Sequence, residues 1–229
     1  MKRSKNRIPW GRLFYWDLLF HSLYLCRSVS FDIWLASRKT DVDFGELKFG
    51  ETNLKSIQAI LAKIPINSDS TIFELGCGRG RAAFLLHFLT GAKIVAIDVV
   101  GPFITTGRRL ARWTGCEQHL LFSYENFLDT ELSDADVVYA CALCFSQSTR
   151  ENLAKNLKKC RPGTYLVSVG WNPKRSWLKP LEHFTSRFSW GQATLYISQI
   201  QQSEPSSESS RIVSAVSPHC HRSCSGHSL

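Results

Sequence analysis

The chain has 229 residues, of which 44% are hydrophobic and 21% charged, and its formal net charge is +9. That length fits one domain with short appendages, and the apolar content excludes a disordered, fibrous or collagen-like chain. The positive charge points to an acidic partner such as nucleic acid, anionic lipid or an acidic protein. It gives no information about the fold.

The surplus charge is confined to two blocks. Residues 1–40 hold eight Lys and Arg against two Asp, residues 150–190 hold nine against two Glu, and the remainder is net acidic. Eight cysteines, several within apolar runs, indicate free thiols in a reducing compartment. We therefore expect a cytoplasmic protein.

Residues 1–48 form a basic, aromatic segment that we expect to be helical. A basic start is followed by an apolar run, 13–26, which Asp17 and His21 interrupt and which is shorter than the roughly 20 residues of a spanning helix. The pattern predicts an amphipathic helix or a pair of helices over Arg12–Ser37. Two roles stay open for it: a lid on the main domain, or attachment of residues 1–38 to an anionic membrane surface.

From residue 49 onward, strands alternate with helices. Such alternation predicts right-handed crossovers and a parallel sheet that is covered on both faces. The expected helices are 53–63, 81–89, 104–113 and 147–159, and the expected strands are 71–75, 93–97, 119–122, 135–141 and 164–169.

At the end of this domain the alternation of strands and helices stops. Two β-like runs, 184–190 and 193–200, flank Trp190-Gly191-Gln192 and predict a hairpin. Residues 49–200 are thus predicted to form an α/β, Rossmann-like, doubly wound seven-stranded sheet, mostly parallel with an antiparallel C-terminal hairpin. Residues 201–229 are Ser-rich and predict a disordered tail. The His and Cys residues of that tail follow no zinc spacing, so no metal site is predicted.

The most informative stretch is Glu74-Leu-Gly-Cys-Gly-Arg-Gly80, which joins the first strand to the following helix. Its glycines let the backbone turn sharply and let a ligand approach closely. An acid two residues before the first glycine is wrong for a pyrophosphate but suits a ligand that carries an amine. Asp98 ends the next strand, where a carboxylate accepts hydrogen bonds from ribose hydroxyls. Adenosine joined to an amino acid describes S-adenosylmethionine (SAM).

These residues resemble the class I, seven-stranded SAM-dependent methyltransferases over about residues 45–200. The resemblance implies that Glu74 lies near the methionine amine, Asp98 holds the ribose diol and Val99 lies against adenine. It also implies that S-adenosylhomocysteine is the product. Further cofactor contacts are expected around the glycine turn and after the third strand, at Gly76, Cys77, Gly78, Gly80, Glu125, Asn126 and Phe127.

Phe49-Gly50-Glu51-Thr52 resembles a segment of the non-SET protein-lysine methyltransferases that packs over the methionine end of the cofactor. This resemblance adds Glu51 and Thr52 to the cofactor contacts, although the same residues also fit a simple helix cap. The fourth strand and its exit correspond to the lysine channel of the histone-methylating branch, but the paired asparagines of that branch are absent. The expected rim of the acceptor channel is formed by Phe49, Glu51, Cys141 and Phe145, and no catalytic base is nominated.

The sequence thus favours transfer of a methyl group from SAM to a lysine of a protein substrate. Methylation of RNA or of a small molecule stays open, because the basic block 150–190 suits phosphates; nucleic acid is the less favoured partner. A non-catalytic SAM-binding or membrane-adaptor module is the third reading.

Overall fold

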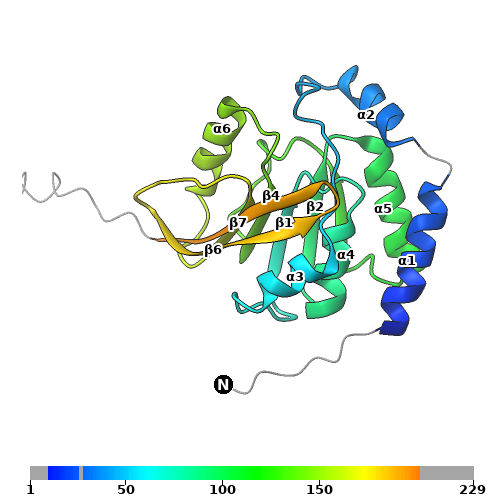
Figure 1. Cartoon of the computed structure of the whole chain (residues 1–229), viewed down its shortest axis with the longest axis horizontal. Helices are drawn as coiled ribbons and strands as arrows, with labels where there is room; N and C mark the ends of the chain where they lie inside the picture. The colour runs from blue at the N-terminus through cyan, green and yellow to red at the C-terminus, as the bar shows by residue number, and fades with distance from the viewer. Residues whose placement is uncertain (1–9, 26–27, 202–229) are drawn as a thin grey trace, which may run out of the picture.

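The computed structural model describes residues 10–25 and 28–201, so the predicted C-terminal tail lies outside these ranges except for its first residue, Gln201. Seven strands form a single sheet in the order β3-β2-β1-β4-β5-β7-β6 (Figure 1). The neighbours among β1 to β5 are parallel, and β7 runs antiparallel to both β5 and β6. The predicted fold class is confirmed. The strands are β1 Thr71–Leu75, β2 Lys93–Asp98, β3 Leu120–Tyr124, β4 Val137–Cys141, β5 Tyr165–Val169, β6 Leu178–Phe188 and β7 Gly191–Ile200.

Helices cover both faces of the sheet. One apolar cluster joins α1, α3, α4 and α5 to one face, and a second cluster joins α6 to the other. The alternation of strand residues explains this division, because Ile72 belongs to the first cluster and its neighbour Phe73 to the second. The helices are α1 Trp10–Tyr24, α2 Val29–Ser37, α3 Leu54–Leu61, α4 Arg81–Thr90, α5 Gly101–Trp113 and α6 Gln147–Leu157.

The last hairpin is longer than the sequence predicted. Strand β6 begins at Leu178, and its pairing with β7 shifts register between Pro180 and Glu182. Proline cannot donate a ladder hydrogen bond, but β6 is an edge strand, where this loss is tolerated. Because proline is disfavoured in strands, the sequence pattern predicted only the second half of β6.

The N-terminal segment forms two helices rather than one. Ser28 ends the break between them and caps α2 by accepting a hydrogen bond from the backbone N–H of Phe31 at 3.3 Å. Helix α1 buries Leu13, Trp16 and Phe20 against the first apolar cluster. It thus covers α4 and α5 and not the cavity described below. Within the described ranges, no helix is long and apolar enough to cross a membrane.

Arg81 ties α1 to the rest of the domain. Its guanidinium lies 3.0 Å from the carboxylate of Asp17 and 5.4 Å from the ring centre of Trp16. Arg81 directly follows the last glycine of the turn and begins α4. The structure explains the arginine by its pairing with α1.

Candidate active site

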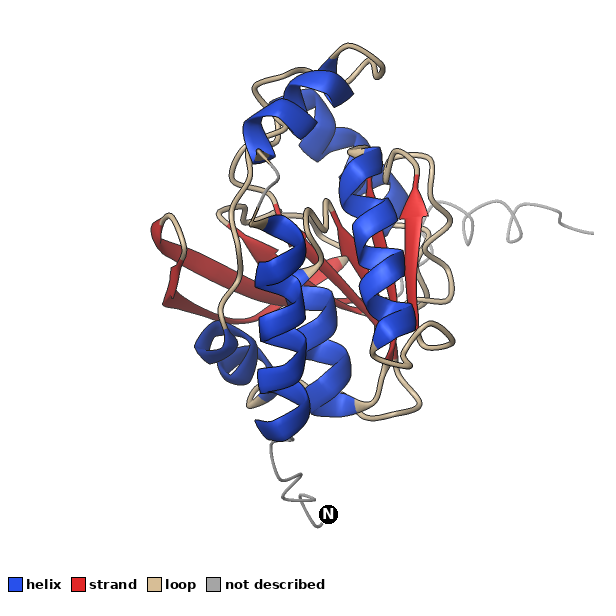
Figure 2. Ribbon diagram, turned by 90° about the vertical axis from the view of Figure 1, so that its right-hand side faces the viewer, coloured by secondary structure: helices blue, strands red, loops and turns tan. Residues whose placement is uncertain are grey.

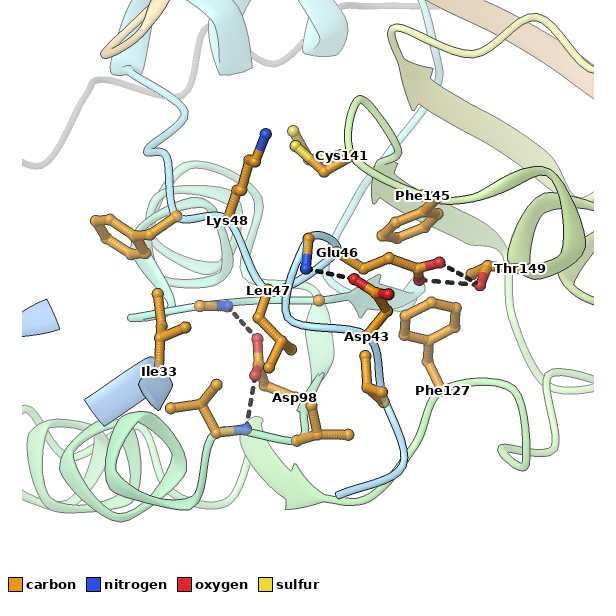
Figure 3. Close-up of a pocket in the computed structure, with 18 of the residues that line it drawn as sticks. Ile33, Asp43, Glu46, Leu47, Lys48, Asp98, Phe127, Cys141, Phe145 and Thr149 are labelled. Carbon is orange, nitrogen blue, oxygen red and sulfur yellow. Dashed lines mark hydrogen bonds between the residues drawn. The ribbon is translucent and has the colours of Figure 1, made fainter. Parts of the chain in front are cut away.

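A cavity of about 940 Å³ lies at the carboxyl ends of the parallel strands (Figure 3). This edge is where open α/β sheets bind their ligands, because the turns that follow neighbouring strands meet there. Five stretches supply most of the lining: the glycine turn after β1 (Gly76 and Gly78), the end of β2 (Asp98 to Val100), the segment after β3 (Asn126 to Leu128), the exit of β4 (Cys141 and Leu143 to Ser146) and residues 41–43 and 45–50. Single residues of α2, α5 and the hairpin and two of α6 complete it: Ile33, Phe103, Trp190, Ser148 and Thr149.

Asp98 is a buried carboxylate that lines the cavity at the end of β2. One carboxylate oxygen accepts a hydrogen bond from the N–H of Gly78 at 2.7 Å, and the other accepts one from the N–H of Val100 at 2.8 Å. Burial raises the pKa of Asp98, and the backbone donors oppose that rise. Each oxygen keeps a second acceptor position. The side chain therefore joins the glycine turn to the end of β2 and presents acceptors to the cavity.

The turn before α4 requires glycine for its backbone and for close packing. Gly78 has a φ of +54°, and a Cβ at this position would lie 3.2 Å from the Phe49 ring. The aromatic ring of the 49–52 segment thus lies directly on the glycine turn.

The tip of the C-terminal hairpin holds that segment in place. Glu51 donates its N–H to Ser189 Oγ at 2.8 Å and accepts a hydrogen bond from the Ser189 N–H at 3.2 Å. The indole of Trp190 lies so close to Gly50 that a Cβ there would sit 2.0 Å from a ring carbon. Nothing local in the sequence could reveal these contacts, because the partners are 138 residues apart.

Residues 41–48 form the outer wall of the cavity, which the sequence analysis did not identify. A Glu46 oxygen accepts hydrogen bonds from the Ser146 N–H at 3.0 Å and from the Thr149 hydroxyl at 2.9 Å, and these anchor the segment to the start of α6 (Figure 3). Asp43 accepts a hydrogen bond from the Gly45 N–H. The described lining holds four carboxylates (Asp41, Asp43, Glu46 and Asp98) against a single lysine, Lys48.

The β4 exit and the segment after β3 together supply an apolar, aromatic side of the cavity. The rings of Phe127 and Phe145 stack with centroids 5.0 Å apart. Burial raises the pKa of Cys141 to about 12. Its thiol therefore stays neutral at physiological pH and acts as an apolar wall instead of a nucleophile.

The structure separates the predicted site residues into two groups. Nine line the cavity: Phe49, Gly76, Gly78, Asp98, Val99, Asn126, Phe127, Cys141 and Phe145. Six do not belong to the lining: Glu51, Thr52, Glu74, Cys77, Gly80 and Glu125.

Structural contacts account for several residues of the second group. The Thr52 hydroxyl is buried and lies 2.7 Å from the Tyr139 hydroxyl. Glu51 lies 3.8 Å from the Arg81 guanidinium. Gly80 faces the ring of Phe122, as discussed below.

Glu74 lies just behind the cavity, buried on β1. Its Oε2 has no hydrogen-bond partner among the described residues. Burial raises its pKa well above the ordinary value, and the nearby charge of Asp98 adds to the rise. A cationic group close to Glu74 would favour its ionised form.

The raised pKa of Glu74 predicts a pH-dependent loss of stability. Above the ordinary carboxyl pKa of 4.5, the folded state keeps a proton that the unfolded state releases. Stability then falls as the pH rises toward the folded-state pKa, by about 1.4 kcal/mol per pH unit in that window. Glu74→Gln should remove this slope, which urea unfolding at a series of pH values measures. An unchanged slope in the variant would show that Glu74 is ionised when buried.

No protein-family model matches the chain. Among curated proteins, it is 27% identical over 104 residues to the methyltransferase phqN of Penicillium fellutanum and 25% identical over 140 residues to a geranyl diphosphate 2-C-methyltransferase of Streptomyces lasalocidi. The aligned parts are 44% and 59% of this chain, but only 32% and 42% of these relatives. A protein-lysine N-methyltransferase of Saccharolobus islandicus is 27% identical over 132 residues, which are 52% of this chain and 77% of that protein.

Solved structures agree on the fold. An RNA methyltransferase from Salinibacter ruber in complex with S-adenosylhomocysteine superposes with a TM-score of 0.54 at 22% identity, covering 68% of this chain and 97% of that one. A geranyl diphosphate methyltransferase in complex with SAM gives 0.53 at 15% identity, covering 65% and 85%. The chain therefore has the fold of the class I, seven-stranded SAM-dependent methyltransferases.

Proposed function

We propose that this protein is a SAM-dependent methyltransferase whose acceptor is an amine, and that the amine is a lysine side chain of a protein. The cofactor is supported by the Asp98 acceptors, by the glycine turn and by solved neighbours bound to SAM or S-adenosylhomocysteine. The curated relatives divide among acceptors: a diphosphate in one name and a protein lysine in another. The charge of the cavity is the observation that separates these acceptors.

The described residues fit the cofactor. In the proposed arrangement, the free acceptor positions of Asp98 would take the ribose hydroxyls, and the buried Glu74 would lie behind the methionine end. Val99, Asn126 and Phe127 line the side on which the adenine would lie. The cofactor brings an activated methyl group, so the protein needs to align the acceptor and exclude water.

The outer half of the cavity suits a cation. Asp41, Asp43 and Glu46 line it, and Lys48 is the one base in the described lining. A diphosphate or an RNA backbone would meet net repulsion there, whereas an ammonium group would be attracted. This is the observation that carries the proposed amine acceptor.

The inner wall then explains how the amine reacts without a dedicated base. An amine must lose its proton before it attacks the methyl group. Next to the Phe145 ring and the neutral thiol of Cys141, poor solvation lowers the pKa of an ammonium and favours the neutral form. The acidic segment would thus draw in the cation, and the aromatic side would promote its deprotonation beside the donor.

Charge reversal at the rim tests this proposal. Asp41→Lys combined with Asp43→Lys should lower kcat/KM for methylation of protein by about tenfold or more, with an unchanged Kd for SAM. Radiolabelled SAM, incubated with a lysate that is then separated into protein, RNA and lipid fractions, gives the readout. Asp129→Lys, which alters an exposed acid outside the cavity lining, is the matched control.

Other outcomes of this experiment would reject either the amine acceptor or the catalytic activity. Label confined to RNA or lipid, or reversal variants as active as wild type, would reject the amine acceptor. SAM binding with no transfer to any fraction would leave a non-catalytic SAM-binding module.

A further inference from the structure

The outer face of α1 and α2 is apolar where a helix on a domain surface is ordinarily polar. The side of α1 that faces away from the domain exposes three large apolar side chains, Trp10, Phe14 and Leu18. Leu25, just past the end of the helix, continues this row. Phe14 is 74% exposed, Leu18 58% and Leu25 84%. The opposite side of α1 is already buried in the core, so these outward apolar side chains are not covered by their own domain. His21, which is also exposed, lies among them on the same side of the helix.

Helix α2 extends this face. Phe31 and Trp34 are exposed and stack with centroids 5.8 Å apart, and Arg38 lies over the Trp34 ring at 4.4 Å. Trp and Tyr are the side chains that favour the boundary between water and hydrocarbon, and Trp10, Tyr15 and Trp34 are all exposed.

The charge around this face is positive. Among the described residues of α1 and α2, the acids are Asp17, which pairs with Arg81, and Asp32, which is buried. Helix α5 contacts both helices, and its exposed side carries Arg108, Arg109 and Arg112 with no acid in the helix. Figure 1 places α1, α2 and α5 on one side of the molecule, the side that Figure 2 turns toward the viewer.

We infer that this face, formed by the exposed residues of α1 and α2 and the arginines of α5, lies on the surface of an anionic lipid bilayer. Apolar and aromatic side chains would enter the interface, while the arginines would meet the headgroups. Four further basic residues, Lys2, Arg3, Lys5 and Arg7, precede α1 in the sequence. A second copy of the chain fits less well, because two faces of the same positive charge repel each other.

Attachment here would leave the cavity free. Helix α2 presents Ile33 to the cavity and Phe31 and Trp34 to the surface, so the site and the proposed membrane face lie on opposite sides of one helix. This inference does not depend on the proposed acceptor.

Co-sedimentation of the full chain with vesicles tests the inference. We expect binding to phosphatidylcholine–phosphatidylglycerol vesicles at low salt, weaker binding at high salt and little binding to phosphatidylcholine alone. Phe14→Ser with Leu18→Ser should weaken binding by about tenfold or more, and Arg109→Glu with Arg112→Glu should do likewise. Leu121→Ser with Leu181→Ser, which removes exposed leucines from β3 and β6, should bind like wild type. An unchanged Kd for SAM shows that each variant is folded.

Three results would overturn the inference: no binding of the wild type to the anionic vesicles, equal binding to neutral vesicles, or full binding by the Phe14→Ser, Leu18→Ser variant. If the wild-type chain does not bind vesicles, two other partners can be tested. A dimer in analytical ultracentrifugation would assign the face to a second copy if the Phe14→Ser, Leu18→Ser variant abolishes it. RNA binding that the same variant abolishes would assign the face to RNA.

Discussion

Replacing Asp98 with alanine should weaken the binding of SAM by about 100-fold or more. The substitution removes two buried acceptors, for the N–H groups of Gly78 and Val100, as well as the carboxylate proposed to bind the ribose. Hydrogen bonds to a charged group contribute about 1.5–3 kcal/mol each, and a buried donor that loses its partner adds its own desolvation penalty. Isothermal titration with SAM and with S-adenosylhomocysteine measures the change.

Two further variants separate the roles of Asp98. Asp98→Asn keeps the shape of the side chain but can accept only one of the two backbone hydrogen bonds, so we expect an intermediate loss. Asp129→Ala removes an exposed acid five residues after β3 and should bind SAM like wild type. If Asp98→Ala binds SAM normally while remaining folded, the cofactor does not use this carboxylate, and the proposed orientation in the cavity is wrong.

The periodic parts of the fold were predictable because local patterns determine them. Each parallel strand is a short apolar run, and each is followed by a turn with its own polar or glycine signal. The run Thr71–Leu75 into the glycine turn is the clearest example, and its observed bounds match the prediction. Strand β3 ends two residues later than predicted, at Tyr124, because its last residues are only partly covered and carry a weaker apolar signal.

The candidate site was predictable where it follows a strand and unpredictable where it depends on long-range contacts. Asp98 is the last residue of β2 and Asn126 follows β3 by two residues, so parallel topology alone brings them together. The outer wall is different: Glu46 lines the cavity because Ser146 and Thr149 hold it there, 100 residues along the chain. The acids between Asp41 and Glu46 were visible in the sequence, but only the fold places them at the cavity.

Gly78 and Gly80 also show that a sequence motif does not determine the role of each of its residues. The sequence motif assigns Gly78 and Gly80 alike to the cofactor. In the structure, Gly78 lines the cavity, whereas a Cβ on Gly80 would lie 2.6 Å from the Phe122 ring. The second glycine of the pair is thus explained by the packing of α4 on β3, without any ligand.

Gly80→Ala should lower the free energy of unfolding by about 2–5 kcal/mol. Two costs add. The φ of Gly80 is +80°, which disfavours a residue with a Cβ by about 1–2 kcal/mol, and forcing a methyl group into the Phe122 ring costs about 1–3 kcal/mol. The ring cannot move away cheaply, because Phe84 and Gly107 also bound it and it is nearly fully buried.

The chain offers matched controls for each cost. Gly115 has a φ of +65° with open space around it, so Gly115→Ala should report the backbone cost alone. Gly107 lies within α5, and its Cβ would lie 2.5 Å from the same Phe122 ring, so Gly107→Ala should report the packing cost reduced by the roughly 1 kcal/mol that alanine gains over glycine inside a helix. Urea unfolding of the three variants should give a loss for Gly80→Ala close to the sum of the other two once that roughly 1 kcal/mol of helix propensity is added back to the loss of Gly107→Ala.

A double variant then locates the clash. Phe122→Leu shortens the side chain that both glycines meet, so it should reduce the loss caused by Gly80→Ala and by Gly107→Ala but leave that of Gly115→Ala unchanged. If Gly80→Ala instead keeps the stability of the wild type and loses only SAM affinity, Gly80 serves the cofactor after all. The packing of Phe122 would then be a consequence of the turn and not the reason for its last glycine.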